Sequence, residues 1–338
     1  MNRFSEVRTG LAALAAACAI GMPAATAAGD DPYLRPRTPP EPAANRTTPA
    51  RVALGKALFF DPRLSRSNWI SCATCHNPAL GWSDGLPTGI GHGMNPLKRA
   101  TPTILNSAFS KILMWDGRAH DLEEQALGPV AAVVEMNQDI PGLVVKLSRI
   151  EGYVGMFEKA YPKEGISGKT IAKAIAAFER TVLSTESPFD RWRKGDAGAV
   201  SVAAKRGFGL FTGKASCVAC HQGFNFQDDG FHNIGLKTLG AEEDLGRYEH
   251  RKVNVARGAF KTPTLRDVAL SAPYMHNGIY RTLDEVVEHY DRGGDVKEHL
   301  DPNMRALGLT AQEKADLVEF MKSLTGKPMQ VTVPQLPN

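Results

Sequence analysis

The chain has 338 residues, of which 43% are hydrophobic and 22% are charged, so it has enough apolar material for two packed domains. Its formal net charge of +4 is too balanced to indicate a nucleic-acid-binding protein. No stretch is apolar over the roughly 20 residues that a membrane-spanning helix needs, so we expect no membrane span.

The first 27 residues have the pattern of a secretory signal peptide. Arg3 and Arg8 precede an apolar run over residues 11–22, and small residues follow it. We therefore predict cleavage before Ala28 and export to the periplasm. Because two arginines and one glutamate would leave with the peptide, the net charge would change from +4 to +3.

Cys18 raises the alternative of a lipoprotein signal. Ala15 argues against it, because such sites prefer a larger aliphatic residue at that position. Residues 28–49 are rich in proline and charge and predict an extended leader or linker. A first helix is expected over residues 50–60, ending before Asp61-Pro62.

The pentapeptide Cys-x-x-Cys-His follows, and it recurs 145 positions later, from Cys72 to Cys217. The spacing lets two thiols bond to the two vinyl groups of one porphyrin while the imidazole reaches the iron, so each copy predicts a covalently attached c-type haem. A redox dithiol or half of a zinc site would need only the cysteine pair, and no cysteines remain to complete a zinc cluster. The expected attachment residues are Cys72, Cys75, His76, Cys217, Cys220 and His221.

Between the two motifs the pattern is that of loops and amphipathic helices. A glycine-rich loop without periodicity covers residues 81–95. Helices are expected over residues 140–150 and 170–183, where apolar residues recur at helical spacing. A domain boundary is expected over residues 188–198.

The second half repeats the order of the first. A helix over residues 203–211 precedes the second motif, and capping boxes mark two later helices that begin at Thr282 and Thr310. Strand signals are weak throughout. The prediction is a mostly α-helical fold of two cytochrome-c-like domains, over residues 50–190 and 198–328, each with one covalently bound c-type haem.

Six stretches resemble the bacterial dihaem cytochrome c peroxidase and MauG family, in the family's order and over nearly the whole mature chain. In that family the N-terminal haem reacts with peroxide and the C-terminal haem handles electrons, which implies that this chain is an oxidoreductase. The stretches are Leu58–Ser65 continued by Ser71–His76, Trp115–Arg118, Leu122–Gln125, Val134–Asn137, Thr262–Arg266 and Pro273–Gly278.

The resemblance implies three catalytic residues. Glu135 looks like the acid–base residue above the first iron, with Gln125 beside it, because cleavage of peroxide needs a proton moved from one oxygen to the other. Without the resemblance, a solvated glutamate at a helix end would be the better interpretation of Glu135. Trp115 looks like the family's indole between the haems, although a core tryptophan also fits.

Each haem iron has a further ligand position besides the motif histidine. The residue at that position sets the reduction potential of the haem and controls access to the iron. His92 resembles the loop histidine that blocks the first iron in resting cytochrome c peroxidases and that leaves when the other haem is reduced. MauG-type enzymes typically lack it. His92 is therefore a candidate ligand of the first iron.

Tyr290 stands where cytochrome c peroxidases carry a methionine ligand of the second iron and where MauG carries a tyrosine. Methionine raises the potential of a haem, whereas an anionic tyrosinate stabilises its ferric form. The helical spacing of Tyr290 also fits a plain core tyrosine, and Met275 is a rival ligand.

The sequence leaves open whether the protein binds calcium. The family binds one ion between its domains through the asparagine of an Arg-Asn-x-Pro-Thr run, but this chain has Ala100 at that position. The carbonyl groups of Ser271 and Pro273 remain available as hard oxygen ligands.

Three functions are consistent with these residues. The first expectation is a periplasmic peroxidase that reduces hydrogen peroxide to water with electrons from a small c-type cytochrome or cupredoxin, supported by His92, Gln125, Glu135 and Trp115. The alternative is a MauG-like enzyme that uses peroxide to oxidise tryptophan or tyrosine residues of a partner protein, supported by Tyr290. A non-catalytic dihaem electron carrier is the third, and Glu135 argues against it because a carrier needs no acid–base group.

Overall fold

The computed structural model describes Met1 and residues 31–240 and 242–338, so nearly all of the predicted signal peptide lies outside the described residues. The unit considered below is Pro32–Asn338. Its α-helices are α1 (Pro49–Phe60), α2 (Cys72–Cys75), α3 (Leu122–Ala131), α4 (Ile140–Ser148), α5 (Glu151–Ala160), α6 (Gly168–Glu179), α7 (Pro188–Arg193), α8 (Val202–Thr212), α9 (Leu283–Asp291) and α10 (Ala311–Ser323).

Short 3₁₀ helices and one small sheet fill the loops. The strands β1 (Phe231–His232) and β2 (Phe260–Lys261) pair antiparallel, with Phe231 opposite Lys261. The 3₁₀ helices are η1 (Ala43–Asn45), η2 (Pro62–Leu64), η3 (Pro78–Leu80), η4 (His92–Met94), η5 (Ser107–Phe109), η6 (Cys217–Ala219), η7 (Arg247–Glu249), η8 (Asn254–Ala256) and η9 (Val268–Leu270).

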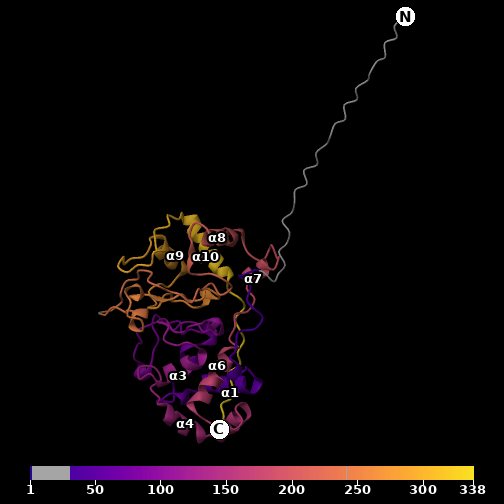
Figure 1. The fold of residues 1–338 in the computed structure, drawn as a ribbon, viewed down its shortest axis with the longest axis vertical. Coiled ribbons are helices and arrows are strands. Elements are labelled where there is room, and N and C mark those ends of the chain that lie inside the picture. The colour runs from indigo at the N-terminus through magenta and orange to yellow at the C-terminus, as the bar shows by residue number, and fades with distance from the viewer. Residues whose placement is uncertain (2–30, 241) are drawn as a thin grey trace. The chain divides into compact units, whose positions relative to one another are not determined.

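Each half contains a pair of crossing helices, α1 with α6 and α8 with α10, and a glycine lies at each crossing. A Cβ on Gly55 would collide with the carbonyl oxygen of Ala174, and one on Gly207 would collide with that of Asp316. Only glycine therefore allows the backbones to approach so closely. Figure 1 shows α1, α3, α4 and α6 gathered in one half and α8, α9 and α10 in the other.

The hydrophobic core is divided in the same way. One cluster is built from α1 and α3 to α6, and a second from α7 to α10. A smaller third cluster includes Leu113, Leu122 and Ala176. The chain thus forms a mostly helical fold of two halves, as predicted, and none of the described helices combines the length and apolarity needed to cross a bilayer.

A loop after each haem motif is built alike in the two halves. Thr101-Pro102-Thr103 and Thr262-Pro263-Thr264 are followed, at the same spacing, by a 3₁₀ helix, a methionine with positive φ and an α-helix. Equivalent positions in the two halves can therefore be compared directly. The equivalent elements are η5, Met114 and α3 in the first half and η9, Met275 and α9 in the second.

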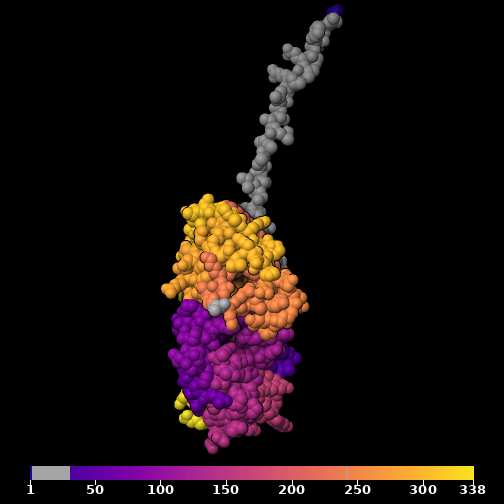
Figure 2. All heavy atoms as spheres, turned by 90° about the vertical axis from the view of Figure 1, so that its left-hand side faces the viewer, coloured from indigo at the N-terminus to yellow at the C-terminus, as the bar shows by residue number. Residues whose placement is uncertain are grey.

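The residues after α10 return to the first half. Met329 and Val331 pack against the first hydrophobic cluster, and Arg63 Nη2 donates a hydrogen bond of 2.9 Å to the carbonyl of Pro337. In Figure 2 the yellow end of the chain accordingly lies against the magenta N-terminal half. We call residues 325–338 the C-terminal tail.

The predicted helices are present, and both capping boxes are confirmed at the starts of α9 and α10. The predicted helix over 170–183 begins two residues earlier and ends at Glu179. Four α-helices were not predicted: α2, α3, α5 and α7. The last of these falls inside the expected boundary over 188–198, and its Phe189 is buried in the second cluster.

Candidate haem sites

Both motif histidines make the same hydrogen bond. His76 Nδ1 lies 3.1 Å from the carbonyl oxygen of Trp82, and His221 Nδ1 lies 2.7 Å from that of Phe226. Burial lowers the pKa of both imidazoles, so each ring is neutral. Because a carbonyl can only accept, Nδ1 carries the proton and donates it, which leaves the lone pair on Nε2 free to bind iron.

The two acceptor residues have an unusual backbone conformation. Trp82 and Phe226 are fully buried, yet their φ angles are +61° and +49°. Bulky residues rarely adopt this left-handed region, and each instance costs about 1–3 kcal/mol. The surrounding structure must therefore hold both carbonyl groups in place.

The four motif cysteines form no disulfide bond with one another. Burial raises the pKa of Cys75 to about 11 and that of Cys217 to about 12, and it also raises the pKa of Cys72. A raised pKa disfavours the thiolate form of these three residues, which a redox dithiol or a zinc site would need. The residues of both motifs fit covalent attachment of a haem.

A cavity of about 290 Å³ lies beside the second motif. Its lining includes Cys217, Cys220 and His221, together with Trp115 from the first half. The site of the second haem therefore extends to the boundary between the halves. Such a largely preformed pocket suits a flat apolar group.

Tyr290, near the end of α9, lines this cavity. Met275, which precedes α9 in the chain, lines it as well. The capping box fixes the start of α9, and Val287 packs its inner face into the second cluster. Burial raises the pKa of the Tyr290 phenol, and charge on Cys217 and Cys220 would raise it further. Both rival ligands thus lie at the same cavity.

Glu135 lies in the turn after α3. Its side chain is 25% exposed, and Arg118 Nη2 lies 4.0 Å from its Oε1. Burial raises the pKa of Glu135, and the charge of Arg118 partly opposes this. A negative charge on Glu135 also raises the pKa of Cys75, so the carboxylate is close to the first haem motif.

Gln125 lies on α3, and its Nε2 contacts the sulfur of Met114 at 3.7 Å. Trp115 follows Met114, and its Nε1 donates a hydrogen bond of 2.9 Å to the carbonyl of Ala100. The amide of Ala100 in turn donates to the carbonyl of His276 at 2.7 Å. The indole is therefore fixed where the two halves meet.

His92 begins η4, beside the turn that carries Glu135. Its backbone amide donates to the carbonyl of Val134 at 3.0 Å, and a Cβ on Gly91 would collide with that same carbonyl. His92 Nδ1 is buried and has no hydrogen-bond partner among the described residues. A buried polar atom without a partner is costly, so this nitrogen is a candidate for contact with a bound group.

Two polar features were missed by the sequence analysis. Arg118 is part of the Trp-Asp-Gly-Arg stretch, but nothing in the sequence pairs it with Glu135. Ala100, which replaces the family's asparagine, uses its backbone in the contacts with Trp115 and His276. Ser271 and Pro273 both line the cavity, and calcium binding there stays a prediction.

Comparisons with known proteins show the family to which the chain belongs. Residues 49–198 match the family model described as di-haem cytochrome c peroxidase, and residues 204–325 match the model of cytochrome c. The methylamine utilization protein MauG of Methylorubrum extorquens is 49% identical over 90% of this chain and 86% of its own length.

Two further relatives are informative. The cytochrome c551 peroxidase of Pseudomonas aeruginosa is 39% identical over 84% of this chain and 81% of its own length. The crystal structure of a MauG-like protein associated with microbial copper homeostasis covers 87% of this chain and 94% of that one, with 31% identity and a TM-score of 0.80.

Proposed function

Because this chain belongs to the di-haem cytochrome c peroxidase and MauG family, and so is an oxidoreductase with two c-type haems, we propose that it uses hydrogen peroxide to oxidise aromatic side chains of a partner protein. One observation carries the proposal: Tyr290 lines the cavity of the second motif together with His221. The 49% identity to a MauG protein supports the same assignment. The two candidate functions are thereby ranked in the reverse of the order expected from the sequence.

The chain's own residues have distinct roles in this proposal. Cys72 and Cys75 would hold the first haem and Cys217 and Cys220 the second, and His76 and His221 would bind their irons. When bound, the haems supply the iron that reacts with peroxide and the capacity to store oxidising equivalents. Each turnover takes two electrons and two protons and converts one peroxide into two water molecules.

Glu135 is proposed as the proton carrier. It takes a proton from one peroxide oxygen and returns it to the other, while the amide of Gln125 orients the peroxide. Burial raises the pKa of Glu135 toward the working pH, which is the range in which a carboxylate carries protons best. Trp115, fixed between the halves by its bond to Ala100, is proposed as the path for electrons.

Tyr290 is proposed as the distal ligand of the second iron. A phenolate oxygen is a hard anionic donor, and it would make this site a poor entry port for electrons but a good store for an oxidising equivalent. The electrons would then come from a protein substrate. We further propose a periplasmic location, through the signal peptide predicted over residues 1–27.

The test is an EPR and optical spectrum of the oxidised protein, repeated after one equivalent of peroxide is added without a reductant. A high-spin first haem, a low-spin second haem with His/Tyr ligation, and a lasting spectral change at both would support the proposal. Two low-spin haems that do not respond to peroxide would overturn it.

The second candidate is a peroxidase that takes electrons from a small c-type cytochrome or cupredoxin. The observation that favours it is the buried Nδ1 of His92, which has no hydrogen-bond partner among the described residues, while the backbone of His92 is bonded to Val134, the residue before Glu135. If His92 binds the first iron at rest, the same experiment would give two low-spin haems that become reactive only after one of them is reduced.

A further inference from the structure

The loop after the second haem motif is held through three consecutive carbonyl groups, those of Phe224, Asn225 and Phe226. The carbonyl of Phe226 accepts the bond from the motif histidine, so the first two bonds fix the place of that acceptor. Arg266 Nε donates to the carbonyl of Phe224 at 2.7 Å, and Thr264 Oγ1 donates to that of Asn225 at 2.8 Å. His221 Nδ1 donates to the carbonyl of Phe226 at 2.7 Å.

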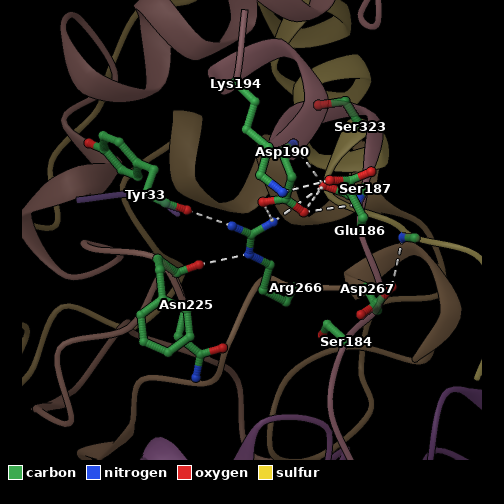
Figure 3. A network of polar contacts seen from close by, with 12 residues as sticks. Tyr33, Ser184, Glu186, Ser187, Asp190, Lys194, Asn225, Arg266, Asp267 and Ser323 are labelled. Atoms are coloured by element: carbon green, nitrogen blue, oxygen red, sulfur yellow. Dashed lines mark hydrogen bonds and ion pairs between the residues drawn. The ribbon is translucent and has the colours of Figure 1, made fainter. Parts of the chain in front are cut away.

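Arg266 makes this arrangement rigid. Its side chain is only 2% exposed. Its Nη1 lies 2.8 Å from a carboxylate oxygen of Asp190 on α7, and its Nη2 donates to the carbonyl of Tyr33 at 2.7 Å (Figure 3). A planar guanidinium with five donors can hold three elements at fixed angles, and the buried pairing with Asp190 offsets the cost of burying its charge.

The first half has no arginine at the equivalent position, although the hydrogen bonds of the threonine and of the motif histidine are repeated there. Thr103 Oγ1 donates to the carbonyl of Gly81 at 2.6 Å, just as Thr264 does to Asn225. The position equivalent to Arg266 is Leu105, a buried apolar residue that donates nothing from its side chain. The histidine bond is 3.1 Å long in the first half and 2.7 Å in the second.

We propose that Arg266 is a positioning residue of the second haem, which strengthens the hydrogen bond between His221 and Phe226 and so stabilises the oxidised form of that haem. A stronger bond from Nδ1–H makes the imidazole a more basic ligand, and a more basic ligand favours ferric iron. The inference rests on the proposed role of His221 as iron ligand. It is independent of whether Tyr290 or Met275 binds opposite.

The decisive variant is Arg266→Lys. A lysine keeps the charge beside Asp190, but one ammonium group cannot reproduce the fork that reaches Phe224, Asp190 and Tyr33 together. We expect the potential of the second haem to rise, that of the first to stay unchanged, and the Nδ1 proton of His221 to exchange faster with solvent in NMR spectra. A folded variant with both haems attached and no change in any of these would overturn the proposal.

Arg206→Lys is the matched control. Arg206 makes a two-point ion pair with Asp316 in the same half, through Nε and Nη2 at 2.7 Å each. Both of these bonds go to Asp316 and neither reaches the Phe224–Phe226 loop, so the potential of the second haem should not move. An equal shift in both variants would show a general effect of arginine loss and would also overturn the proposal.

Ser187→Ala provides a second test that removes no charge. Ser187 Oγ accepts from Arg266 Nη1 at 3.3 Å and donates to Asp190 Oδ2 at 2.7 Å. If Arg266→Lys does not fold, Ser187→Ala should give a smaller shift in the same direction, and no shift would count against the inference. A wild-type second haem without the EPR signature of histidine ligation would instead refute the assignment of His221.

Discussion

Two opposing effects act on the pKa of the Glu135 carboxyl group. Burial against the first haem motif favours the protonated carboxyl group, whereas Arg118 favours the carboxylate. Burial is the larger effect, so the pKa is raised. The two effects can be separated by substitution at each of the two residues.

Glu135→Gln removes the proposed proton carrier and leaves the size of the side chain unchanged. We expect the rate of reaction with hydrogen peroxide, measured by stopped flow, to fall by about 10²–10⁴-fold while the absorption spectra of both haems stay the same. Glu158→Gln, an exposed position on α5, is the control. An unchanged rate would remove Glu135 from the mechanism.

Arg118→Leu removes the charge that lowers the pKa of Glu135, so this pKa should rise further. In the proposed mechanism the carboxylate is the active form, so activity is expected to be lost as the pH falls through this pKa. The acidic limb of the pH–rate profile should therefore move to higher pH, and the move should be modest because the pair is partly exposed and screened by solvent. Arg118→Lys keeps the charge and should leave the limb in place. A shift to lower pH would contradict the argument.

Tyr290→Met exchanges an anionic oxygen donor for a neutral thioether. If Tyr290 is the ligand, the potential of the second haem should rise, because the ferric form loses its anionic partner. Redox titration of both haems measures this, and the first haem serves as the internal control. If neither potential moves, Tyr290 is a core residue and the second iron has another ligand.

At the scale of helices, the crossings of α1 with α6 and of α8 with α10 depend on the absence of a side chain. Capping residues and apolar spacing locate these helices in the sequence, but the contact between them is invisible there. The helix α3 escaped prediction because Gly128 and Pro129 lie within it, and both residue types usually interrupt a helix.

Gly207→Ala tests the crossing. The added Cβ meets backbone of α10, which cannot move aside as a side chain can, so we expect a loss of about 1–3 kcal/mol in the free energy of unfolding. Gly209→Ala lies on the same helix, where a Cβ would meet no described atom within 4 Å. It should be neutral or stabilising by up to about 1 kcal/mol. Equal losses in the two variants, measured by thermal unfolding, would refute the packing argument.

At the scale of the whole molecule, a partly buried ion-pair network joins the halves. Arg99 of the first half contacts both carboxylate oxygens of Asp244 in the second, at 2.7 and 2.8 Å, and it also pairs with the buried Asp116. Asp116 adjoins Trp115, so the network lies beside the proposed electron path. Its loss should affect both stability and communication between the haems.

Asp244→Asn leaves Arg99 with a weaker partner. We expect the free energy of unfolding to fall by about 1–3 kcal/mol, and electron exchange between the haems to slow. Glu243→Gln, at the neighbouring exposed position, should change neither quantity. A variant as stable as the wild type, with unchanged exchange in flash photolysis, would show that the network does not hold the halves together.

The sequence predicted features that depend on residues close together in the chain, but not contacts between residues far apart in it. The haem motifs, the capping boxes and most helices are encoded within a few residues, and these predictions were confirmed for the helices and for the two c-type haems. The pairing of Arg99 with Asp244 and of Arg266 with Phe224 joins residues far apart in the chain, and no local pattern announces it. The roles of Glu135, His92 and Tyr290 remain predictions.

The C-terminal tail has a consequence for biosynthesis. A ribosome delivers the N-terminal half first, but the outer layer of that half includes Met329 and Val331, which are made last. The first core therefore stays unfinished until translation of the second half is complete. We expect an attachment enzyme to reach the thiols of the first Cys-x-x-Cys-His segment most easily before the C-terminal tail packs against that half.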